Sequence, residues 1–404
     1  MHFSKEECLE FVNENDVRFI RLQFTDIYGN AKNIAITGKQ LAGAFEKGVM
    51  FDGSAVPGFT GIEASDMFLF PDPETFSIMP WRPQQGKVAR IICAIKNPDG
   101  SQFEGDSRYI LKRTLKKAQD LGYTFHVGPE CEFFMFFNDD QGMPTTNTHD
   151  TAGYCDLAPM DLGENTRREI CFVLEEMGFE IETSHHESAA GQHEIDFRYT
   201  DALSAADSIV TFKMVVKIIA QRNGLHATFM PKPLPHVNGS GMHINMSLSK
   251  NGRNLFSGEN NADLSETAKF FTAGLLKHIK GITAITNPLV NSYKRLKTGY
   301  EAPVHIAWSH MNRSPLLRVP APRGEGTRIE LRSPDPSCNP YLTLALLLEA
   351  GMDGLNNRLP LMKPVNVNIY DLTAEQEEKL KLDRLPSNLL LALEEMKKDP
   401  LIKA

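Results

Sequence analysis

Hydrophobic and polar positions alternate with a period of two along several short stretches of the chain. Residues 17–36, VRFIRLQFTDIYGNAKNIAI, alternate on both sides of Tyr28-Gly29-Asn30, which predicts a β-hairpin. Residues 87–95, KVARIICAI, predict another strand. The first hundred residues are therefore strand-rich. They end at the turn-dense segment NPDGSQFEGD, and we place a domain boundary there, near residue 105.

Beyond this boundary the apolar positions recur with helical spacing. The helical segments are SRYILKRTLKKAQDLG (107–122), NTRREICFVLEEMG (165–178), ADSIVTFKMVVKIIAQRNG (206–224), SETAKFFTAGLLKHIKG (265–281) and NPYLTLALLLEAGMDGL (339–355). The first has Asp106 or Ser107 as its cap and stops at Gly122. Strands lie between the helices without alternating one for one. This favours an α+β fold with largely antiparallel pairing over a doubly wound parallel sheet.

Four of the predicted strands have one apolar face and one face of unusual polarity. In GPECEFFMF (128–136), Glu130 and Glu132 point the same way because side chains alternate along a strand. GQHEIDFRY (191–199), GMHINMSL (241–248) and TRIELRS (327–333) repeat the arrangement. Each of these strands could simply turn its polar face to water, as one-sided antiparallel sheets do.

The types of residue on the polar faces argue for a binding site instead. They are short of Lys, Ser and Thr, and they supply Glu130, Glu132, Glu194, Glu330 and His243, with Glu187 nearby. Several buried carboxylates repel one another and need countercharge. Carboxylates with one imidazole suit Mg²⁺ or Mn²⁺, whereas HESAAGQH (186–193) lacks the histidine spacing of a zinc protease. Because six ligands exceed what one such ion takes from protein, we predict two or more metals, kept partly open for substrate phosphates.

An arginine-rich stretch follows these strands. Residues 295–335 contain Arg295, Arg313, Arg318, Arg323, Arg328 and Arg332. Such a basic run can be a solvated face, yet Arg328 and Arg332 flank Glu330 on one face of one strand. Guanidinium groups beside metals point to phosphoryl transfer. The chain has no GxxxxGK[ST] loop and no GxGxxG pattern, and NGSG (238–241) is either an ordinary tight turn or a close approach of backbone to a small substrate.

Composition narrows the class of protein further. The chain has 404 residues and a formal net charge of −8, which gives no electrostatic reason to expect nucleic acid or a membrane surface as a partner. No apolar run is long enough to span a bilayer, and the six cysteines form no CxxC pair. We expect a soluble cytoplasmic protein with reduced thiols.

Eight segments taken together resemble bacterial type I glutamine synthetases. They are FDGS (51–54), GPECEFF (128–134), HHESAAGQHEIDF (185–197), KPLPHVNGSGMHINMSL (232–248), NSYKRLKTGYEAP (291–303), NRSPLLRVP (312–320), RGEGTRIELRSPDP (323–336) and NPYLTLALLLEAGMDG (339–354). The resemblance runs from the first hairpin almost to the C-terminus. It implies a small N-terminal β-grasp-like domain (1–105) and a large catalytic domain (106–404), whose curved antiparallel sheet forms a funnel backed by helices.

The resemblance also implies a division of the metal ligands. Glu132, Glu187 and Glu194 would hold the ion nearer glutamate and ammonia. Glu130, His243 and Glu330 would hold the ion nearer ATP phosphate, with two to three Mg²⁺ or Mn²⁺ ions per site. Cys131, between two ligands, should pack in the core.

The substrate residues follow from the same resemblance. Arg295 would grip the α-carboxylate of glutamate beside Asn238 and Gly239, and Arg313, Arg318 and Arg332 would neutralise phosphate. Glu182, Tyr199, Ser247 and Arg328, together with Arg318, would line the nucleotide site. The implied reaction phosphorylates the γ-carboxylate of glutamate with ATP, and ammonia then displaces phosphate to give glutamine.

Two further acids complete the implied site. Glu301 matches the family's flap carboxylate, which accepts a proton from ammonium, and Asp52 matches the acid that attracts ammonium. In the family Asp52 reaches the neighbouring subunit, which implies rings of six and, usually, a dodecamer of two stacked rings. Relatives normally continue a few dozen residues beyond MKKDPLIKA, and that tail helps to tie two rings together, so the ring count stays open.

Three positions depart from family patterns. Gly61 stands where the feedback-inhibited branch often has arginine, so control by glutamine would differ. Asn245 replaces a histidine of some relatives. Tyr370 resembles a region that is adenylylated in another branch, and we predict no modification of it.

Two rival functions remain open at this point. A γ-glutamyl ligase that uses an amine would share the metals and arginines but would need a less acidic ammonium pocket, and Asp52 and Glu301 argue against it. A structural or regulatory relative would be marked by lost ligands, and all six are present.

Overall fold

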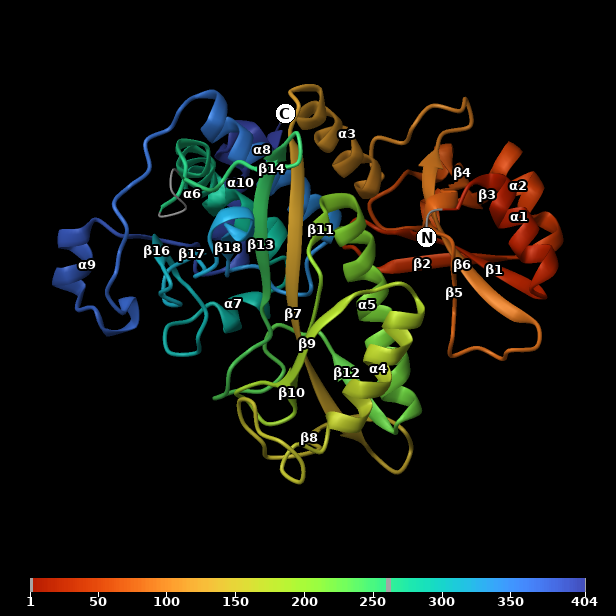
Figure 1. Cartoon of the computed structure of the whole chain (residues 1–404), viewed down its shortest axis with the longest axis horizontal. Coiled ribbons are helices and arrows are strands. Elements are labelled where there is room, and N and C mark those ends of the chain that lie inside the picture. The colour runs from red at the N-terminus through yellow and green to blue at the C-terminus, as the bar shows by residue number, and fades with distance from the viewer. Residues whose placement is uncertain (1–2, 259–262, 404) are drawn as a thin grey trace.

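The computed structural model describes residues 3–258 and 263–403, and its strands form two large sheets with separate cores (Figure 1). The smaller sheet has the order β2-β1-β6-β4-β3, with β5 paired to β6. Its strands are β1 (Val17–Thr25), β2 (Ala31–Thr37), β3 (Val49–Asp52), β4 (Asp66–Pro71), β5 (Ser77–Ile78) and β6 (Lys87–Lys96). The predicted hairpin is confirmed as β1 and β2, while β1 and β6 are parallel. Helices α1 (Lys5–Glu14) and α2 (Leu41–Lys47) belong to this domain.

The larger sheet has the order β16-β17-β18-β13-β7-β10-β9, and β8, β11 and β12 also pair with β7, as β14 does with β13. Its strands are β7 (Thr124–Asn138), β8 (Pro144–Thr148), β9 (Ile181–His186), β10 (Gln192–Phe197), β11 (Thr200–Asp201), β12 (Leu225–Thr228), β13 (Met242–Lys250), β14 (Arg253–Asn254), β16 (Trp308–His310), β17 (Leu317–Val319) and β18 (Ile329–Leu331). Within this sheet every printed pairing except β16–β17 is antiparallel. A further pair joins β15 (His305–Ile306) to β19 (Asp383–Arg384). The prediction of an α+β fold is confirmed.

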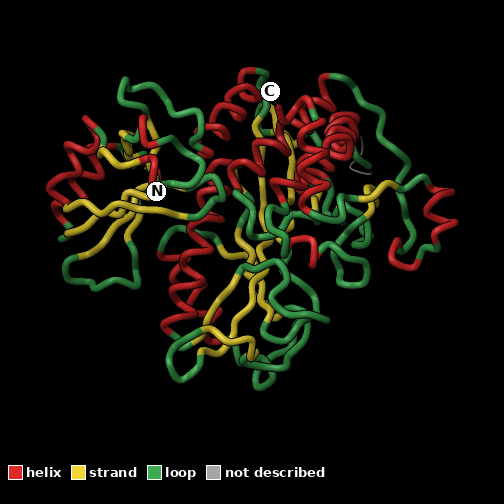
Figure 2. The backbone as a smooth tube through the Cα atoms, turned by 180° about the vertical axis from the view of Figure 1, so that it is seen from behind, coloured by secondary structure: helices red, strands yellow, loops and turns green. Residues whose placement is uncertain are grey.

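Helices border the larger sheet, whose strands run through the middle of the molecule in the view from behind (Figure 2). The helices that follow β6 are α3 (Ser107–Asp120), α4 (Glu164–Glu176), α5 (Ala202–Arg222), α6 (Glu266–Thr286), α7 (Ser292–Arg295), α8 (Pro340–Asn356), α9 (Ala374–Leu380), α10 (Leu389–Lys398) and α11 (Pro400–Lys403). Among the residues that the structure describes, no helix is long and apolar enough to span a membrane.

The five predicted helices are confirmed as α3, α4, α5, α6 and α8, with different ends. Asp106 is the cap of α3, since its side chain accepts from Arg108 N. Helix α5 begins earlier than predicted because Asp201 caps it through the backbone N–H groups of Leu203 and Ser204. Helix α6 continues past Gly281, where the pattern predicted a stop. Helix α1 was not predicted, although Ser4 and Glu7 form a capping box at its start.

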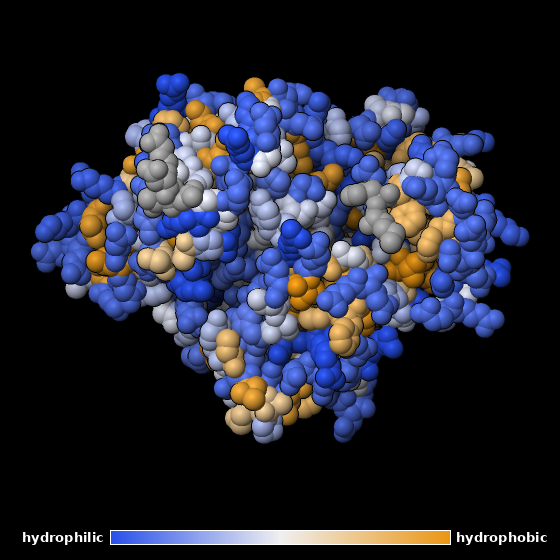
Figure 3. All heavy atoms as spheres, viewed as in Figure 1, coloured by the Kyte–Doolittle hydropathy of each residue, from blue (hydrophilic) through white to orange (hydrophobic). Residues whose placement is uncertain are grey.

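Alternation along β7 separates the core from a polar face. Cys131, Phe133 and Met135 are fully buried in the large hydrophobic core, as predicted for Cys131. Glu130 and Glu132 point to the opposite face of the strand. The fold therefore turns this acidic face of the central strand away from the helical core and toward a hydrophilic hollow, which lies left of centre in Figure 3.

Candidate active site

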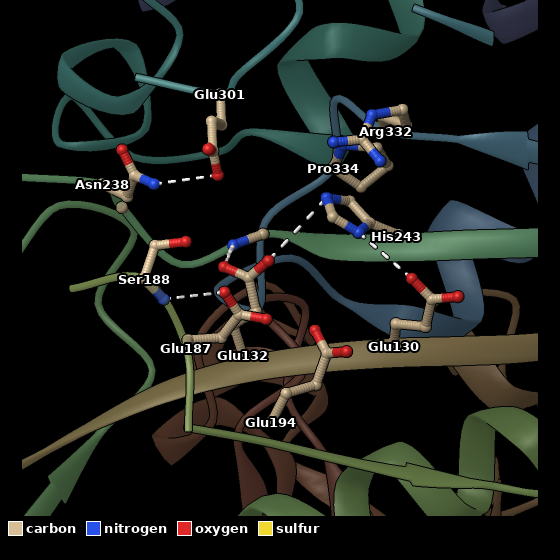
Figure 4. A network of polar contacts seen from close by, with 12 residues as sticks. Glu130, Glu132, Glu187, Ser188, Glu194, Asn238, His243, Glu301, Arg332 and Pro334 are labelled. Atoms are coloured by element: carbon tan, nitrogen blue, oxygen red, sulfur yellow. Dashed lines mark hydrogen bonds and ion pairs between the residues drawn. The ribbon is translucent and has the colours of Figure 1, made fainter. Parts of the chain in front are cut away.

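Pairing between strands brings the predicted metal ligands together. His243 of β13 lies opposite Glu130 of β7, and Glu194 of β10 lies opposite Glu132. On the other side of β13, Asn245 pairs with Glu330 of β18. Residues opposite each other on adjacent strands have Cβ atoms about 5 Å apart, so their side chains share one space. Figure 4 shows Glu130, Glu132, Glu194 and His243 converging, with Glu187 entering from the end of β9.

One group of potential ligands consists of Glu130, His243 and Glu330. His243 Nδ1 lies 3.3 Å from Glu130 Oε2 and 4.0 Å from Glu330 Oε1. Asn245 Nδ2 donates to Glu130 Oε1 at 2.8 Å. Burial opposes ionisation of Glu130, but hydrogen bonds from His243 and Asn245 lower its pKa to about 2. Glu130 is therefore a carboxylate at neutral pH.

A second group consists of His185, Glu187 and Glu194. His185 Nε2 lies 2.9 Å from Glu187 Oε1 and 3.8 Å from Glu194 Oε1. His185 was not among the predicted site residues, yet it pairs with Glu194 across β9 and β10. The repeated HHE and QHE segments could have indicated this histidine, since both lie on paired strands.

Glu132 lies between the two groups. Its Oε2 accepts from Gln192 Nε2 at 2.9 Å and from Gly241 N at 2.8 Å. Its Oε1 lies 3.9 Å from His243 Nε2. Burial is the main reason that the pKa of Glu132 is raised, and the charge of Glu187 adds to it.

The described residues leave part of the negative charge in this cluster uncompensated. Burial and the neighbouring Asp196, Glu132, Glu130 and Glu187 raise the pKa of Glu194 well above its usual range. Burial also raises the pKa of Asp196 to about 6, and Asp196 Oδ1 is a buried oxygen without a hydrogen-bond partner among the described residues. A set of buried oxygen donors whose ionisation is suppressed for want of positive charge fits divalent cations of the Mg²⁺ class.

Two arginines contact the remaining predicted ligand. Glu330 is fully buried, and its two oxygens accept from Arg318 Nη1 and Arg332 Nη1, each at 2.6 Å. Each carboxylate oxygen has a second lone pair, so these contacts leave Glu330 able to bind a cation as well. The Nε atoms of both arginines are buried and have no hydrogen-bond partner in the described parts of the chain, so both guanidinium groups have donors to spare.

Arg295 is fixed by the backbone beside this cluster. It is 2% exposed, and it donates to Ser333 O at 2.7 Å, to Pro334 O at 3.1 Å and to Arg332 O at 3.0 Å. None of these acceptors carries a full charge. Arg295 thus keeps its positive charge available to an anion in the cavity.

Asn238, Gly239 and Glu301 lie on loops on the other side of the same cavity. Asn238 Nδ2 donates to Glu301 Oε2 at 2.9 Å. Glu301 is exposed and has φ of 54°, a conformation that non-glycine residues seldom adopt. Gly239 is required at its position, since a Cβ there would lie 2.2 Å from the carbonyl oxygen of Pro231.

These residues line one cavity of about 1010 Å³. Of the predicted residues it includes Glu130, Glu132, Glu187, Glu194, Asn238, Gly239, His243, Arg295, Glu301, Arg313 and Arg332. It also includes His185, Asp196, Tyr154, Cys155 and Tyr370, none of which was assigned a role in chemistry from the sequence. The hydroxyl of Tyr370 is buried without a partner among the described residues, and burial raises its pKa.

The predicted nucleotide residues lie outside this lining. Tyr199 stacks on His126 with ring centroids 5.2 Å apart, and His126 lies opposite Ser247 in the pairing of β7 and β13. Arg328 Nε donates to Asn245 Oδ1 at 3.0 Å. Glu182 is exposed on β9. Ser247 follows His243 and Asn245 on the same face of β13, so these residues continue the acidic face toward the other end of the strand.

Asp52 is a predicted site residue of the smaller domain and does not line the cavity. It is exposed at the end of β3 in the smaller domain, and its carboxylate accepts from Ser54 N at 2.9 Å and from Ser54 Oγ at 2.6 Å. The other N-terminal position of interest, Gly61, precedes a short 3₁₀ turn, where a Cβ would meet the carboxylate of Glu63.

Comparisons with known proteins place this geometry in a family. The family described as glutamine synthetase, catalytic domain, matches residues 104–404, and the one described as glutamine synthetase, beta-Grasp domain, matches residues 16–98. A glutamine synthetase of Clostridium saccharobutylicum is 60% identical over 402 residues, which cover 99% of this chain and 91% of that protein. One from Staphylococcus aureus strain Mu50 is 56% identical over 403 residues, covering 99% and 90%.

Solved structures agree with the sequences. A GmaS/ADP complex superposes with a TM-score of 0.89 at 32% identity, covering 98% of this chain and 91% of that one. The Plasmodium falciparum glutamine synthetase superposes with a TM-score of 0.88 at 26% identity, covering 100% and 92%. Both family models match this chain, and the relatives are similar over almost its whole length. The chain therefore belongs to the glutamine synthetase family.

Proposed function

We propose that this protein joins ammonia to the γ-carboxylate of L-glutamate through γ-glutamyl phosphate, with conversion of ATP to ADP and phosphate and release of L-glutamine. The observation that carries the proposal is the cavity itself. It combines a cluster of uncompensated carboxylates with arginines that have free donors and with an acidic loop residue, Glu301. These are the requirements of phosphoryl transfer to a carboxylate followed by attack of an amine.

Two or three Mg²⁺ or Mn²⁺ ions would bind the carboxylate cluster. Glu132, Glu187 and Glu194 would hold one ion, with His185 close enough to take part. Glu130, His243 and Glu330 would hold another. When bound, such ions neutralise phosphate charge and fix the oxygens of ATP.

Arginines of this chain would bind the anionic reactants. Arg295, with Asn238 and Gly239, would hold the α-carboxylate of glutamate, since its guanidinium is fixed only by neutral carbonyls. Arg313, Arg318 and Arg332 would stabilise charge on the phosphoryl group during transfer. The phosphoryl group turns an unreactive carboxylate into an acyl phosphate with a good leaving group.

Ammonium must lose a proton before its nitrogen can attack, because NH₄⁺ has no lone pair. Glu301 is exposed at the mouth of the cavity and would accept this proton, while Asn238 holds its carboxylate. Asp52 of an adjacent subunit would attract ammonium. We therefore propose a homo-oligomeric ring of six, in which the smaller domain of one subunit completes the site of the next, and a stacked pair of rings as the usual assembly.

The nucleotide would extend along β13 from the metal cluster. Tyr199 supplies an aromatic face, Ser247 and Glu182 supply polar groups, and Arg318 and Arg328 supply charge at the phosphate side. A cytoplasmic location follows from the use of ATP and from six free cysteines.

The decisive assay follows phosphate release from purified protein with ATP, glutamate and Mg²⁺ or Mn²⁺. Parallel reactions contain ammonium or one of a panel of primary amines. We expect turnover with ammonium and formation of glutamine. Turnover with amines alone would make the protein a γ-glutamyl amide ligase, and no turnover with any acceptor would make it a structural relative.

A further inference from the structure

Arg90 is a buried cation that the active site does not use. It lies on β6, where Ala89, Ile91 and Cys93 point into the core of the smaller domain. Its side chain points the other way and is 7% exposed. Among the residues that the structure describes, no hydrogen bond or ion pair involves the Arg90 guanidinium, and its Nε and Nη1 are buried without partners.

Asp207, the carboxylate whose charge acts on Arg90, is already hydrogen-bonded to other groups. Asp207 of α5 accepts from Arg108 at 2.9 Å and 2.8 Å, and from the Tyr341 hydroxyl at 2.7 Å. Arg108 also pairs with Asp72 at 2.8 Å. This network leaves Arg90 beside Arg108 with no carboxylate of its own. A buried guanidinium without a partner is costly, so a folded protein that keeps one has reason to supply an anion.

Arg90 lines a cavity of about 580 Å³ between the two domains. The smaller domain contributes residues 74–77 and Arg90, and the larger domain contributes Arg108, His126, residues 177–180, residues 197–201 with the predicted nucleotide residue Tyr199, and the start of α5. The cavity is large enough for a metabolite. It also contains Ser204 and Ser208, whose hydroxyls can donate to an anion.

Other charged groups around the cavity have partners or lie at its edge. Glu180 pairs with Arg198, and Asp201 caps α5. Glu74 is exposed. The charge that is both buried and unpaired in this lining is therefore that of Arg90.

We propose that the cavity binds a small molecule with a phosphate or carboxylate group, and that Arg90 holds this oxyanion between the two domains. The guanidinium can donate a charge-assisted hydrogen bond to an oxygen of either group. Ser208 of α5 lines the cavity from the larger domain. The site is separate from the carboxylate cluster, which attracts cations, and the proposal does not depend on the reaction that the cluster catalyses.

A site-resolved test uses selenate, a phosphate-shaped anion that is visible by anomalous scattering. Crystals of the full-length protein and of the Arg90→Gln variant are soaked in selenate. We expect a peak within hydrogen-bonding distance of Arg90 in the original protein and none there in the variant, with any selenate at the active-site arginines present in both. A peak at Arg90 that ADP displaces would make the cavity part of the nucleotide site and would overturn the proposal.

Calorimetric titration with inorganic phosphate tests the site in solution. We expect the original protein to bind phosphate at one more site per chain than Arg90→Gln, or at least tenfold more tightly at that site. Equal phosphate binding by both proteins, or no selenate at Arg90 in the original protein, contradicts the proposal.

A second pair of variants keeps Arg90 in place. Ser208→Glu introduces a carboxylate into the cavity from the larger domain, so we expect a higher melting temperature and loss of selenate at Arg90. Ser208→Gln is the matched control of the same size without charge, and we expect it to retain selenate. If Ser208→Glu binds selenate as well as Ser208→Gln does, the guanidinium does not hold the anion.

Discussion

Two buried polar clusters lie on opposite faces of the same strands. On β10, Glu194 points into the cavity while its neighbour His193 points behind the strand, and at the end of β9 Glu187 and His186 divide in the same way. The front group, here called the carboxylate cluster, consists of Glu130, Glu132, Glu187, Glu194, His243 and Glu330. The rear group, here called the histidine cluster, consists of His149, Asp150, Asp161, Arg167, His186 and His193.

The histidine cluster satisfies itself. Asp150 contacts His149 at 3.0 Å and His186 at 3.1 Å, while Arg167 donates to Asp161 at 2.7 Å and to His193 Nδ1 at 2.9 Å. None of its described buried polar atoms lacks a partner. Its spacing would also allow a metal, but Arg167 donates to Nδ1 of His193, so that nitrogen is not free to bind one.

The carboxylate cluster is buried less completely, since Glu130 and Glu187 are partly exposed, and most of its members line the open cavity. Glu194 and Glu132 have raised pKa values because burial and like charges oppose their ionisation. The difference shows that burial alone does not identify a binding site. A binding site is identified by buried charge that the described residues leave uncompensated. Arg90 is such a charge, with the opposite sign.

The largest effect should come from removing a charged partner from the histidine cluster. Arg167→Met would leave Asp161 buried without its cation, and we expect the free energy of unfolding to fall by about 3–5 kcal/mol. Denaturant titration of the metal-free protein measures this. Arg168→Met, at the exposed neighbouring position, is the control and should change stability by less than about 0.5 kcal/mol. Equal losses in both variants would show that the cluster is not what Arg167 stabilises.

A change in the open cluster should separate activity from stability. Glu194→Gln removes a ligand and also a buried negative charge among like charges. We expect activity to fall by at least about 100-fold, or about 2.7 kcal/mol, while the metal-free protein melts at the same or a higher temperature. Steady-state kinetics and thermal melting measure the two effects. Glu175→Gln, exposed on α4, should change neither, and a strongly destabilised Glu194→Gln would refute the distinction between the clusters.

The pH dependence of the metal-free protein should show a smaller effect with a definite sign. Because the pKa of Asp196 is raised to about 6 and that of Glu194 is raised as well, the folded protein retains protons that the unfolded chain has lost. Stability from such groups is complete at low pH and is lost as pH rises through the folded pKa. We expect a loss of about 1–2 kcal/mol between about pH 5 and pH 8.

Saturating Mg²⁺ should remove this loss, because a bound cation favours the ionised carboxylates. Melting curves across this pH range, with EDTA or with Mg²⁺, measure the two slopes. A metal-free protein that becomes more stable as pH rises would contradict the assignment of raised pKa values to this cluster.

Sequence alternation was sufficient to predict which side chains share a face. The period of two placed Glu130 with Glu132, and His243 with Asn245, on the polar sides of their strands, and the structure confirms both. It could not predict that Glu330 lies between two guanidinium groups, since that depends on β17 pairing with β18.

The mutual pairing of residues in the histidine cluster could not be predicted from the sequence either. His193 and Glu194 are adjacent in the sequence, and only the packing of α4 brings Arg167 to the histidine. His185 was missed because the argument from charge counted carboxylates. Asp52 could be assigned only by resemblance, because no local pattern links an exposed acid of the smaller domain to a cavity in the larger one.

The most direct measurement counts the cations that the carboxylate cluster binds. Equilibrium dialysis with Mn²⁺, read by electron paramagnetic resonance, should find two or three ions per chain in the original protein. Glu194→Gln and Glu130→Gln should each weaken or remove a different ion, and Arg90→Gln should remove none. If the protein binds no Mn²⁺, or if both carboxylate variants bind as much and as tightly as the original protein, the cluster is not a metal site and the account fails.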